Sequence, residues 1–238
     1  MISVYIVDDS AVARAHLKHI LESDPEIRIA GEACSGEEAV EFVRTSRPDV
    51  ITMDISMPRM DGHEATSRIM EMNPVPIVIV SANYSPDQVG QSFRAMEAGA
   101  LAIVEKPPGI GHADYERSAQ DLTRTVKLMS EVSVVRRWRK TRRLPLAPRE
   151  PSLDARSVKA VLIGASTGGP PVLQTVLSGF HAGFPAPILV VQHITKGFIE
   201  GMLEWLGAAI SLPVSLARDG ERALPGRVYF APDDHHMG

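Results

Sequence analysis

The sequence is poor in cysteine, in aromatic residues and in long apolar runs. Among its 238 residues Cys34 is the single cysteine, and phenylalanine, tryptophan and tyrosine together make up 5%. One cysteine cannot form an intrachain disulfide, which is typical of a protein from a reducing compartment. No apolar run reaches the roughly 18 residues that a membrane-spanning helix requires. We therefore expect a cytoplasmic protein that is not inserted in a membrane.

A strong charge of one sign is also lacking. The formal net charge is −4 at pH 7, with 23% charged and 44% hydrophobic residues. This balance is ordinary for a soluble globular protein, and it does not favour nucleic acid or a membrane surface as a partner. The first ten residues, MISVYIVDDS, lack the basic segment with which a secretory signal peptide begins, so none is expected.

The sequence does contain a regular alternation of strand-like and helix-like segments. Apolar runs typical of buried strands occur at 4–8, 28–33, 49–54, 76–81 and 101–105, and segments with helical spacing occur at 13–21, 36–46, 62–72, 86–98 and 113–132. Five strand–helix units in a row predict a parallel sheet with helices on both faces. We expect a five-stranded, flavodoxin-like α/β domain over residues 1–132.

The alternation stops over residues 133–156 and then resumes. Six of the eight residues at 136–143 are Lys or Arg, and LPLAPREPS at 144–152 contains three prolines, which block helix and central strand alike. We interpret this stretch as a linker. Further strands are predicted at 158–166, 186–193, 213–217 and 227–232, and helices at 169–177 and 197–210. Residues 157–238 are therefore predicted to be the N-terminal part of a doubly wound parallel α/β domain.

Acidic side chains stand at the ends of two predicted strands in the first domain. Asp8 and Asp9 end the first strand and Asp54 ends the third. The carboxyl ends of parallel strands form the edge where open sheets bind ligands, and three carboxylates there would repel one another unless a cation such as Mg²⁺ lay among them. Ser81 and Lys106, at the next two strand ends, could bind a phosphoryl group carried on a carboxylate. The alternative is that these acids only cap helices and stay solvated.

These residues resemble the receiver domain of two-component response regulators. The resemblance rests on DD at 8–9, DISMPRMDG at 54–62, Ser81, and KP at 106–107. It implies that Asp54 accepts phosphate from a histidine kinase. It also implies that Asp8, Asp9, Asp54 and the backbone carbonyl of Ser56 hold Mg²⁺. Receivers often carry an aromatic switch residue three positions before the lysine, and Ile103 stands there instead, so a ring that swings inward cannot report phosphorylation.

The segment GASTGG at 164–169 places Ser166 between a predicted strand and a predicted helix. It fits the pattern G-x-S-x-G, whose glycines permit a sharp turn that lifts the hydroxyl above the sheet. Backbone N–H groups at the helix start, that of Thr167 above all, would face the same point and stabilise an oxyanion. A glycine-rich turn with no chemical role is the alternative for this motif taken alone.

A serine hydroxyl needs a base within hydrogen-bond reach to become a good nucleophile. His193 ends the next predicted strand of this region. Adjacent parallel strands lie about 4.8 Å apart, so their end residues can bring imidazole Nε2 close to the hydroxyl Oγ. A histidine considered alone is more often structural, but together the two residues predict Ser166 as nucleophile and His193 as its base.

The second region resembles the catalytic domain of chemotaxis protein-glutamate methylesterases. The resemblance rests on GASTGGP at 164–170, QH at 192–193, GF at 197–198, DGERALPGRVYFAP at 219–232 and HM at 236–237, and on the order receiver, linker, esterase. It implies hydrolysis of glutamyl γ-methyl esters on chemoreceptors, deamidation of receptor glutamines, and control by phosphorylation. No cofactor is expected for the esterase.

The family's third catalytic residue is an aspartate in a glycine-rich segment of the form GMGxDG, and this sequence contains no such segment. Asp219, Asp233 and Asp234 do not lie in that motif. Loss of an orienting carboxylate can cost about 10⁴-fold in turnover. We therefore expect a shortened esterase domain with little activity of its own.

A non-catalytic response regulator, whose second region only binds a partner, is the alternative function. The basic run at 136–143 would allow such a regulator to bind nucleic acid, although basic runs are common in solvated linkers. The DDHH segment at 233–236 could suggest a metal site, but adjacent histidines in a loop are usually solvated.

Overall fold

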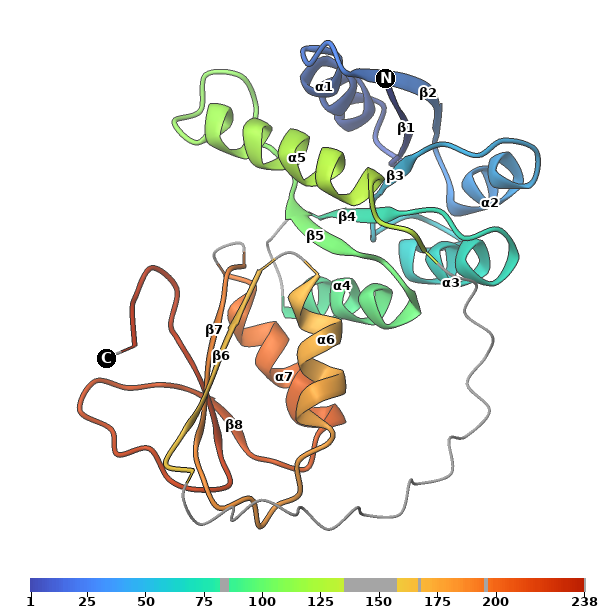
Figure 1. Cartoon of the computed structure of the whole chain (residues 1–238). Helices are drawn as coiled ribbons and strands as arrows, with labels where there is room; N and C mark the ends of the chain where they lie inside the picture. The colour runs from blue at the N-terminus through green and yellow to red at the C-terminus, as the bar shows by residue number, and fades with distance from the viewer. Residues whose placement is uncertain (82–85, 135–157, 167, 195–196, 238) are drawn as a thin grey trace. The chain divides into compact units, whose positions relative to one another are not determined.

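A computed structural model describes residues 1–81, 86–134, 158–166, 168–194 and 197–237, with the side chains at 86–90 left out of the description. The chain divides into two compact units, Met1–Arg139 and Lys140–Gly238, each built on its own parallel sheet (Figure 1). Among the described residues, no helix combines the length and the apolar character needed to cross a bilayer. Most of the predicted linker, 133–156, lies outside the described residues.

The first unit contains a five-stranded parallel sheet with the strand order β2-β1-β3-β4-β5. Its strands are β1 (Ile2–Val7), β2 (Ile27–Ala33), β3 (Val50–Met53), β4 (Ile77–Ser81) and β5 (Ala102–Glu105). Its helices are α1 (Ala11–Glu22), α2 (Gly36–Thr45), α3 (Gly62–Met72), α4 (Pro86–Ala98) and α5 (Tyr115–Ser130). This order confirms the predicted flavodoxin-like parallel fold.

Polar side chains cap the first turn of three of these helices. Ser10 Oγ accepts a hydrogen bond from Ala13 N at 3.3 Å, and Ser35 Oγ accepts one from Glu38 N at 3.3 Å. Asp61 caps α3 in the same way through Glu64 N. Each cap satisfies an N–H group that has no partner inside the helix and so defines the residue at which the helix begins.

The core of the first unit lies on both faces of the sheet. On one face, Leu17 and Leu21 of α1 pack with Leu122 and Val126 of α5 against residues of β1, β3, β4 and β5. Figure 1 shows α1 and α5 on this face and α2, α3 and α4 on the other. Because both faces are covered, the central strands are buried and mostly apolar, as in the fully buried Val50–Met53, where Thr52 is the one polar residue.

The second unit contains a four-stranded parallel sheet with the order β6-β7-β9-β8. Its strands are β6 (Val161–Ala165), β7 (Ile188–Gln192), β8 (Val214–Leu216) and β9 (Val228–Phe230), and its helices are α6 (Gly169–Leu177) and α7 (Ile199–Ala209). The strands β6 and β7 are neighbours, with Ala165 opposite Gln192 at their carboxyl ends. The predicted elements are present, with ends that differ by up to three residues.

The two helices of the second unit cover the same face of its sheet (Figure 1). Leu173 of α6 and Leu206 of α7 are buried there, as are Ile188 and Val190 of β7. The opposite face is open among the described residues, because Leu162 is 78% exposed. The alternation along β7 therefore directs Ile188, Val190 and Gln192 toward the helices.

Candidate functional sites

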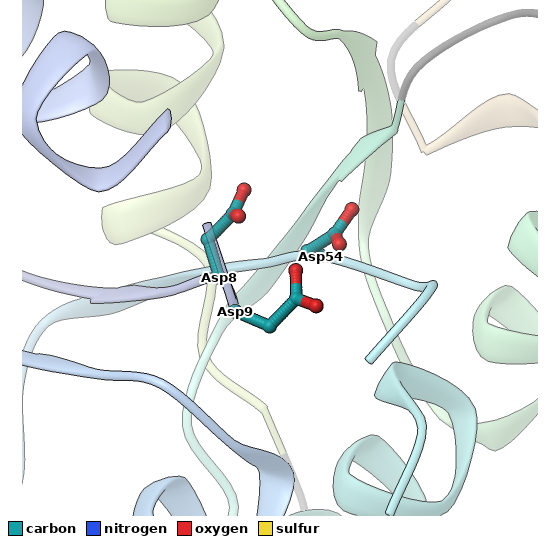
Figure 2. A group of neighbouring side chains, drawn as sticks. All are labelled: Asp8, Asp9 and Asp54. Atoms are coloured by element: carbon teal, nitrogen blue, oxygen red, sulfur yellow. The ribbon is translucent and has the colours of Figure 1, made fainter. Parts of the chain in front are cut away.

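The carboxylates of Asp8, Asp9 and Asp54 gather at the carboxyl ends of β1 and β3. Each residue offers an oxygen atom, and these atoms all lie within 4.8 Å of one another (Figure 2). Asp8 and Asp54 are buried, with 0% and 6% exposure, whereas Asp9 is exposed. Ser10 N donates to Asp8 Oδ1 at 2.9 Å, so the residue that caps α1 also holds the first carboxylate in place.

Lys106 supplies a positive charge to this group of carboxylates. Its Nζ lies 2.7 Å from Asp8 Oδ2 and 3.4 Å from Asp54 Oδ1. Burial alone would lower the pKa of Lys106, but hydrogen bonding and charge attraction from Asp8 and Asp54 outweigh it, and the pKa is raised. The ammonium group is therefore held in its charged form.

Burial is the main influence on the pKa of Asp54. It raises the pKa of this carboxyl group, the nearby charge of Asp8 raises it further, and the attraction of Lys106 opposes both only in part. A bound cation stabilises the ionised form of such a carboxyl group, because it compensates for the solvation of the negative charge that burial has removed. The donor set consists of oxygen atoms only, and three carboxylates face one ammonium, so these residues fit a hard divalent cation.

Ser81 and Lys106 are brought to the same edge by strand pairing. Ser81 of β4 pairs with Glu105 of β5, and Lys106 N donates to Ser81 O at 2.9 Å. Ser56 lies in the β3–α3 connection, two residues after Asp54, and is exposed. Ile103 of β5 pairs with Ile79 of β4. The sequence-predicted residues of this pocket thus come from the ends of β1, β3, β4 and β5.

One glycine sets the path of the chain beside the phosphoacceptor candidate. A Cβ atom added to Gly62, the first residue of α3, would overlap the carbonyl oxygen of Asp54. Gly62 N also donates to Ile55 O at 3.0 Å. The start of α3 is therefore packed directly on the backbone that carries Asp54.

Ser166 and His193 meet at the carboxyl ends of β6 and β7. Ser166 Oγ lies 3.4 Å from His193 Nδ1, and both residues are exposed. The nearest ring nitrogen is Nδ1 rather than the Nε2 that the sequence analysis predicted. His193 N donates to Ala165 O at 2.8 Å, which continues the pairing of β6 and β7 and places the two residues side by side.

The turn that carries Ser166 leads directly into α6. Gly169 N donates to Ser166 O at 2.8 Å, and Gly168 has a φ of 75°, a conformation that favours glycine. Pro170 and Pro171 occupy the first turn of the helix, where no N–H donor is lost from the helix. Thr167, the predicted oxyanion donor, lies outside the described residues.

The sequence analysis quoted Gln192 within the QH segment but gave it no role, and in the structure this residue contacts both turns. Its Nε2 donates to Ser166 O and to His193 O, each at 2.8 Å. The signal in the sequence was its position directly before His193, at the end of a strand.

Asp233, in the loop after β9, contacts the segment that follows His193. Its Oδ2 accepts a hydrogen bond from Gly197 N at 2.8 Å.

Comparisons with known proteins identify both units. The response regulator receiver domain model matches residues 4–112, and the CheB methylesterase model matches residues 161–238. The crystal structure of the response regulator domain of Thermotoga maritima CheB is 35% identical, with a TM-score of 0.50, and the match covers 56% of this chain and 98% of that one.

Curated relatives match along the whole chain. The protein-glutamate methylesterase/protein-glutamine glutaminase of Nitrosospira multiformis is 52% identical over 241 residues, covering 100% of this chain and 68% of the relative. Relatives with the same name from Geobacter metallireducens and Syntrophus aciditrophicus are 51% and 53% identical, and each is covered to 69%. The chain therefore belongs to the protein-glutamate methylesterase/protein-glutamine glutaminase family, with a receiver domain ahead of CheB methylesterase sequence.

Proposed function

We propose that this chain serves as a phosphorylation-controlled protein-glutamate methylesterase and glutaminase in which Ser166 is the nucleophile and His193 the base. The observation that carries the proposal is the 3.4 Å approach of Ser166 Oγ to His193 Nδ1 at the ends of adjacent strands. Family membership favours this enzyme over the non-catalytic regulator. The substrates that fit are glutamyl γ-methyl esters and glutamine side chains of chemoreceptors.

The ester reaction follows from the positions of these groups. With Nδ1 unprotonated, His193 takes the proton of Ser166 Oγ as that oxygen attacks the γ-carbonyl carbon. The negative charge that develops on the carbonyl oxygen is stabilised by N–H groups at the start of α6, for which the Thr167 N–H is our candidate. The C–O bond then breaks, and His193 returns its proton to the departing methanol.

Water completes the cycle. His193 accepts a proton from the water molecule that attacks the acyl carbon, and Ser166 leaves as a protonated hydroxyl group, so glutamate is released. With a glutamine substrate the same steps release ammonia instead of methanol. No cofactor enters either reaction.

Ester hydrolysis by the Ser166→Ala variant tests the catalytic part. Methanol release from a methylated receptor fragment is expected to be slow in this chain, whose sequence contains no GMGxDG segment, and to fall further, to the uncatalysed rate, when the nucleophile is removed. Ser178→Ala is the matched control, since Ser178 is an exposed serine at the end of α6 whose Oγ bonds only to Gln174 O among its described contacts. A Ser166→Ala variant as active as the unaltered chain would contradict the proposal.

We further propose that Asp54 is the phosphoacceptor of the receiver domain, with a chemotaxis histidine kinase as donor. An Asp54 oxygen attacks the phosphorus atom, and the bond to the donor histidine breaks. The residues that would hold Mg²⁺ are Asp8, Asp9, Asp54 and the carbonyl of Ser56; the ion would neutralise phosphoryl charge. Lys106 lies 3.4 Å from Asp54 Oδ1 and is placed to pair with a phosphoryl oxygen, while the Ser81 hydroxyl can donate to another.

A small phosphodonor tests this assignment directly. Intact-mass measurement after treatment with acetyl phosphate and Mg²⁺ is expected to show one added phosphoryl group, absent in Asp54→Ala and retained in Asp114→Ala. Asp114 is a suitable control because it is exposed and makes no capping hydrogen bond at the start of α5. Esterase rates that are equal with and without the phosphodonor would contradict control by phosphorylation.

A further inference from the structure

We propose that Gln192 is a positioning residue that fixes the turn of Ser166 to the turn of His193, and that this requires glycine at position 169. The inference rests on the proposed roles of Ser166 and His193. It concerns how the chain holds these two side chains in register, and it assigns Gln192 no contact with substrate.

The amide group of Gln192 joins the two turns through their backbones. Its Nε2 lies 2.8 Å from Ser166 O and 2.8 Å from His193 O. Both partners are carbonyl oxygens, which only accept hydrogen bonds, so the nitrogen and not the oxygen of the amide must face them. One side-chain group thus holds both catalytic residues by their main chains.

The requirement for glutamine follows from this geometry. Two carbonyl oxygens need two N–H donors, and a side-chain amide supplies both from one nitrogen without a net charge. Gln192 is opposite Ala165 in the strand register and points to the face that α6 covers. Asparagine is one methylene shorter, and methionine has glutamine's length but no donor, so neither can replace it.

Gly169 accommodates the other half of the amide. Gln192 Oε1 is buried and has no hydrogen-bond partner among the described residues, and a Cβ atom on Gly169 would overlap it. The oxygen therefore lies against the first residue of α6, where the helix dipole favours negative partial charge. Gly169 N in turn donates to Ser166 O at 2.8 Å, so Gly169 and Gln192 hold the same carbonyl.

This arrangement matters for reactivity because Ser166 and His193 are both exposed and separated by 3.4 Å, at the long end of hydrogen-bond range. Side chains at exposed turns lose their mutual orientation when the backbones beneath them shift. A displacement of about 1 Å can cost about 100-fold in rate, so loss of this hydrogen-bonded support should reduce nucleophilicity more than it reduces substrate binding.

The test uses the full chain and a fluorophosphonate that modifies activated serines with loss of fluoride. Intact mass and peptide mapping give the maximal modification rate and the half-saturating concentration, and thermal unfolding is measured in parallel. The variants are Gln192→Met, Gln192→Ala, Gly169→Ala and the double variant Gln192→Ala/Gly169→Ala. Gly207→Ala in α7 is the control, because a Cβ atom there meets nothing within 4 Å.

For Gln192→Met we expect the maximal rate at Ser166 to fall about 10- to 100-fold while the half-saturating concentration stays constant. Gly169→Ala should reduce the rate and the unfolding temperature in the unaltered chain, and it should reduce both much less in the Gln192→Ala background, where only the closer approach to Ala165 Cβ remains. A Gln192→Met variant that melts at a lower temperature yet reacts at the full maximal rate would overturn the proposal. Additive effects of Gly169→Ala in both backgrounds would also overturn it.

The proposed function and this inference fail in different ways. An unaltered chain that is not modified at Ser166 contradicts the roles of Ser166 and His193. The unfolding temperatures of the four variants then still decide whether Gln192 and Gly169 are coupled, because that comparison needs no reaction.

Discussion

Lys106 shows at the scale of a single residue how the receiver pocket is held together. It lies beside two buried carboxylates, 2.7 Å from Asp8 Oδ2 and 3.4 Å from Asp54 Oδ1. Removal of one partner from a buried ion pair leaves uncompensated charge and typically costs about 3–5 kcal/mol of folding free energy. We expect a loss of this size for Lys106→Met in urea unfolding without divalent cations.

The pH dependence of that loss has a definite sign. Burial raises the pKa of Asp54 in the folded state, and removal of Lys106 takes away the main opposing influence. A carboxyl group with a raised pKa binds its proton more readily when folded, so the Lys106→Met variant should recover stability as the pH falls from neutral toward the unfolded-state pKa of about 3.9. Lys18→Met, which breaks an exposed pair with Glu32, is the control. An equal loss in both variants would contradict this account of the pocket.

Gly62 provides a second prediction at the residue scale. A Cβ atom at this position would overlap the Asp54 carbonyl oxygen, so Gly62→Ala must displace either α3 or the backbone of Asp54, the proposed phosphoacceptor. We expect a destabilisation of about 1–3 kcal/mol, as for overpacking in a core, together with slower phosphorylation by acetyl phosphate. Gly109→Ala, where a Cβ atom meets nothing within 4 Å, should change neither quantity.

The sequence predicted one part of the geometry of the proposed catalytic site and missed another part for a physical reason. The meeting of Ser166 and His193 was predictable because each directly follows a strand and the two strands are neighbours. The identity of the ring nitrogen was not predictable, because it depends on the side-chain rotamer of His193, which strand order does not set. The role of Gln192 was missed because its acceptors are main-chain carbonyls, and every residue type has one.

At the scale of the element, Asp49 joins the start of β1 to the entry of β3. Asp49 Oδ2 accepts hydrogen bonds from Ser3 Oγ at 2.6 Å and from Ser3 N at 2.7 Å. Both hydrogen bonds lower the pKa of Asp49, and the bond from the Ser3 hydroxyl has the larger effect. A lowered folded-state pKa adds stability that is present above the unfolded pKa of about 3.9 and is lost as the pH falls through the lower folded value.

Asp49→Asn is therefore expected to lower the free energy of unfolding at pH 7 by about 1 kcal/mol. The difference from the unaltered chain should shrink as the pH falls below about 3.9, because protonation of Asp49 removes the charge that its two hydrogen bonds favour. Urea midpoints at pH 7 and pH 2 measure both effects. A constant difference across this range would mean that the charge of Asp49 contributes nothing to the junction of the two strands.

The elements themselves were predicted more accurately than their ends. The run at 158–166 predicted one strand, yet β6 comprises only Val161–Ala165, because pairing with β7 starts at Val161 opposite Ile188. The run at 113–132 predicted one helix, and α5 comprises Tyr115–Ser130. Apolar periodicity reports which face is buried, whereas the ends of a strand depend on its pairing partner and the ends of a helix on the local hydrogen bonds of its caps.

At the scale of the whole molecule, the first unit contains a complete core of its own. The two faces of its sheet are covered by α1 to α5, and its buried cluster includes no residue after Met129. We propose residues 1–132 as the receiver domain and expect this fragment to fold alone and to be stabilised by Mg²⁺ through linkage. Thermal unfolding with and without Mg²⁺ is the measurement, with Asp54→Ala as the variant that should lose the shift. An unfolded fragment would contradict the proposed boundary.

The central claim is that His193 makes Ser166 nucleophilic because the two residues lie at neighbouring strand ends. The most direct test compares the rate of fluorophosphonate modification in the unaltered chain and in the His193→Gln variant. A positioned general base contributes about 10²- to 10⁴-fold, so we predict modification at Ser166 in the unaltered chain and a rate at least about 100-fold lower in the variant. Equal rates in the two chains, or modification of a different residue, would contradict the claim.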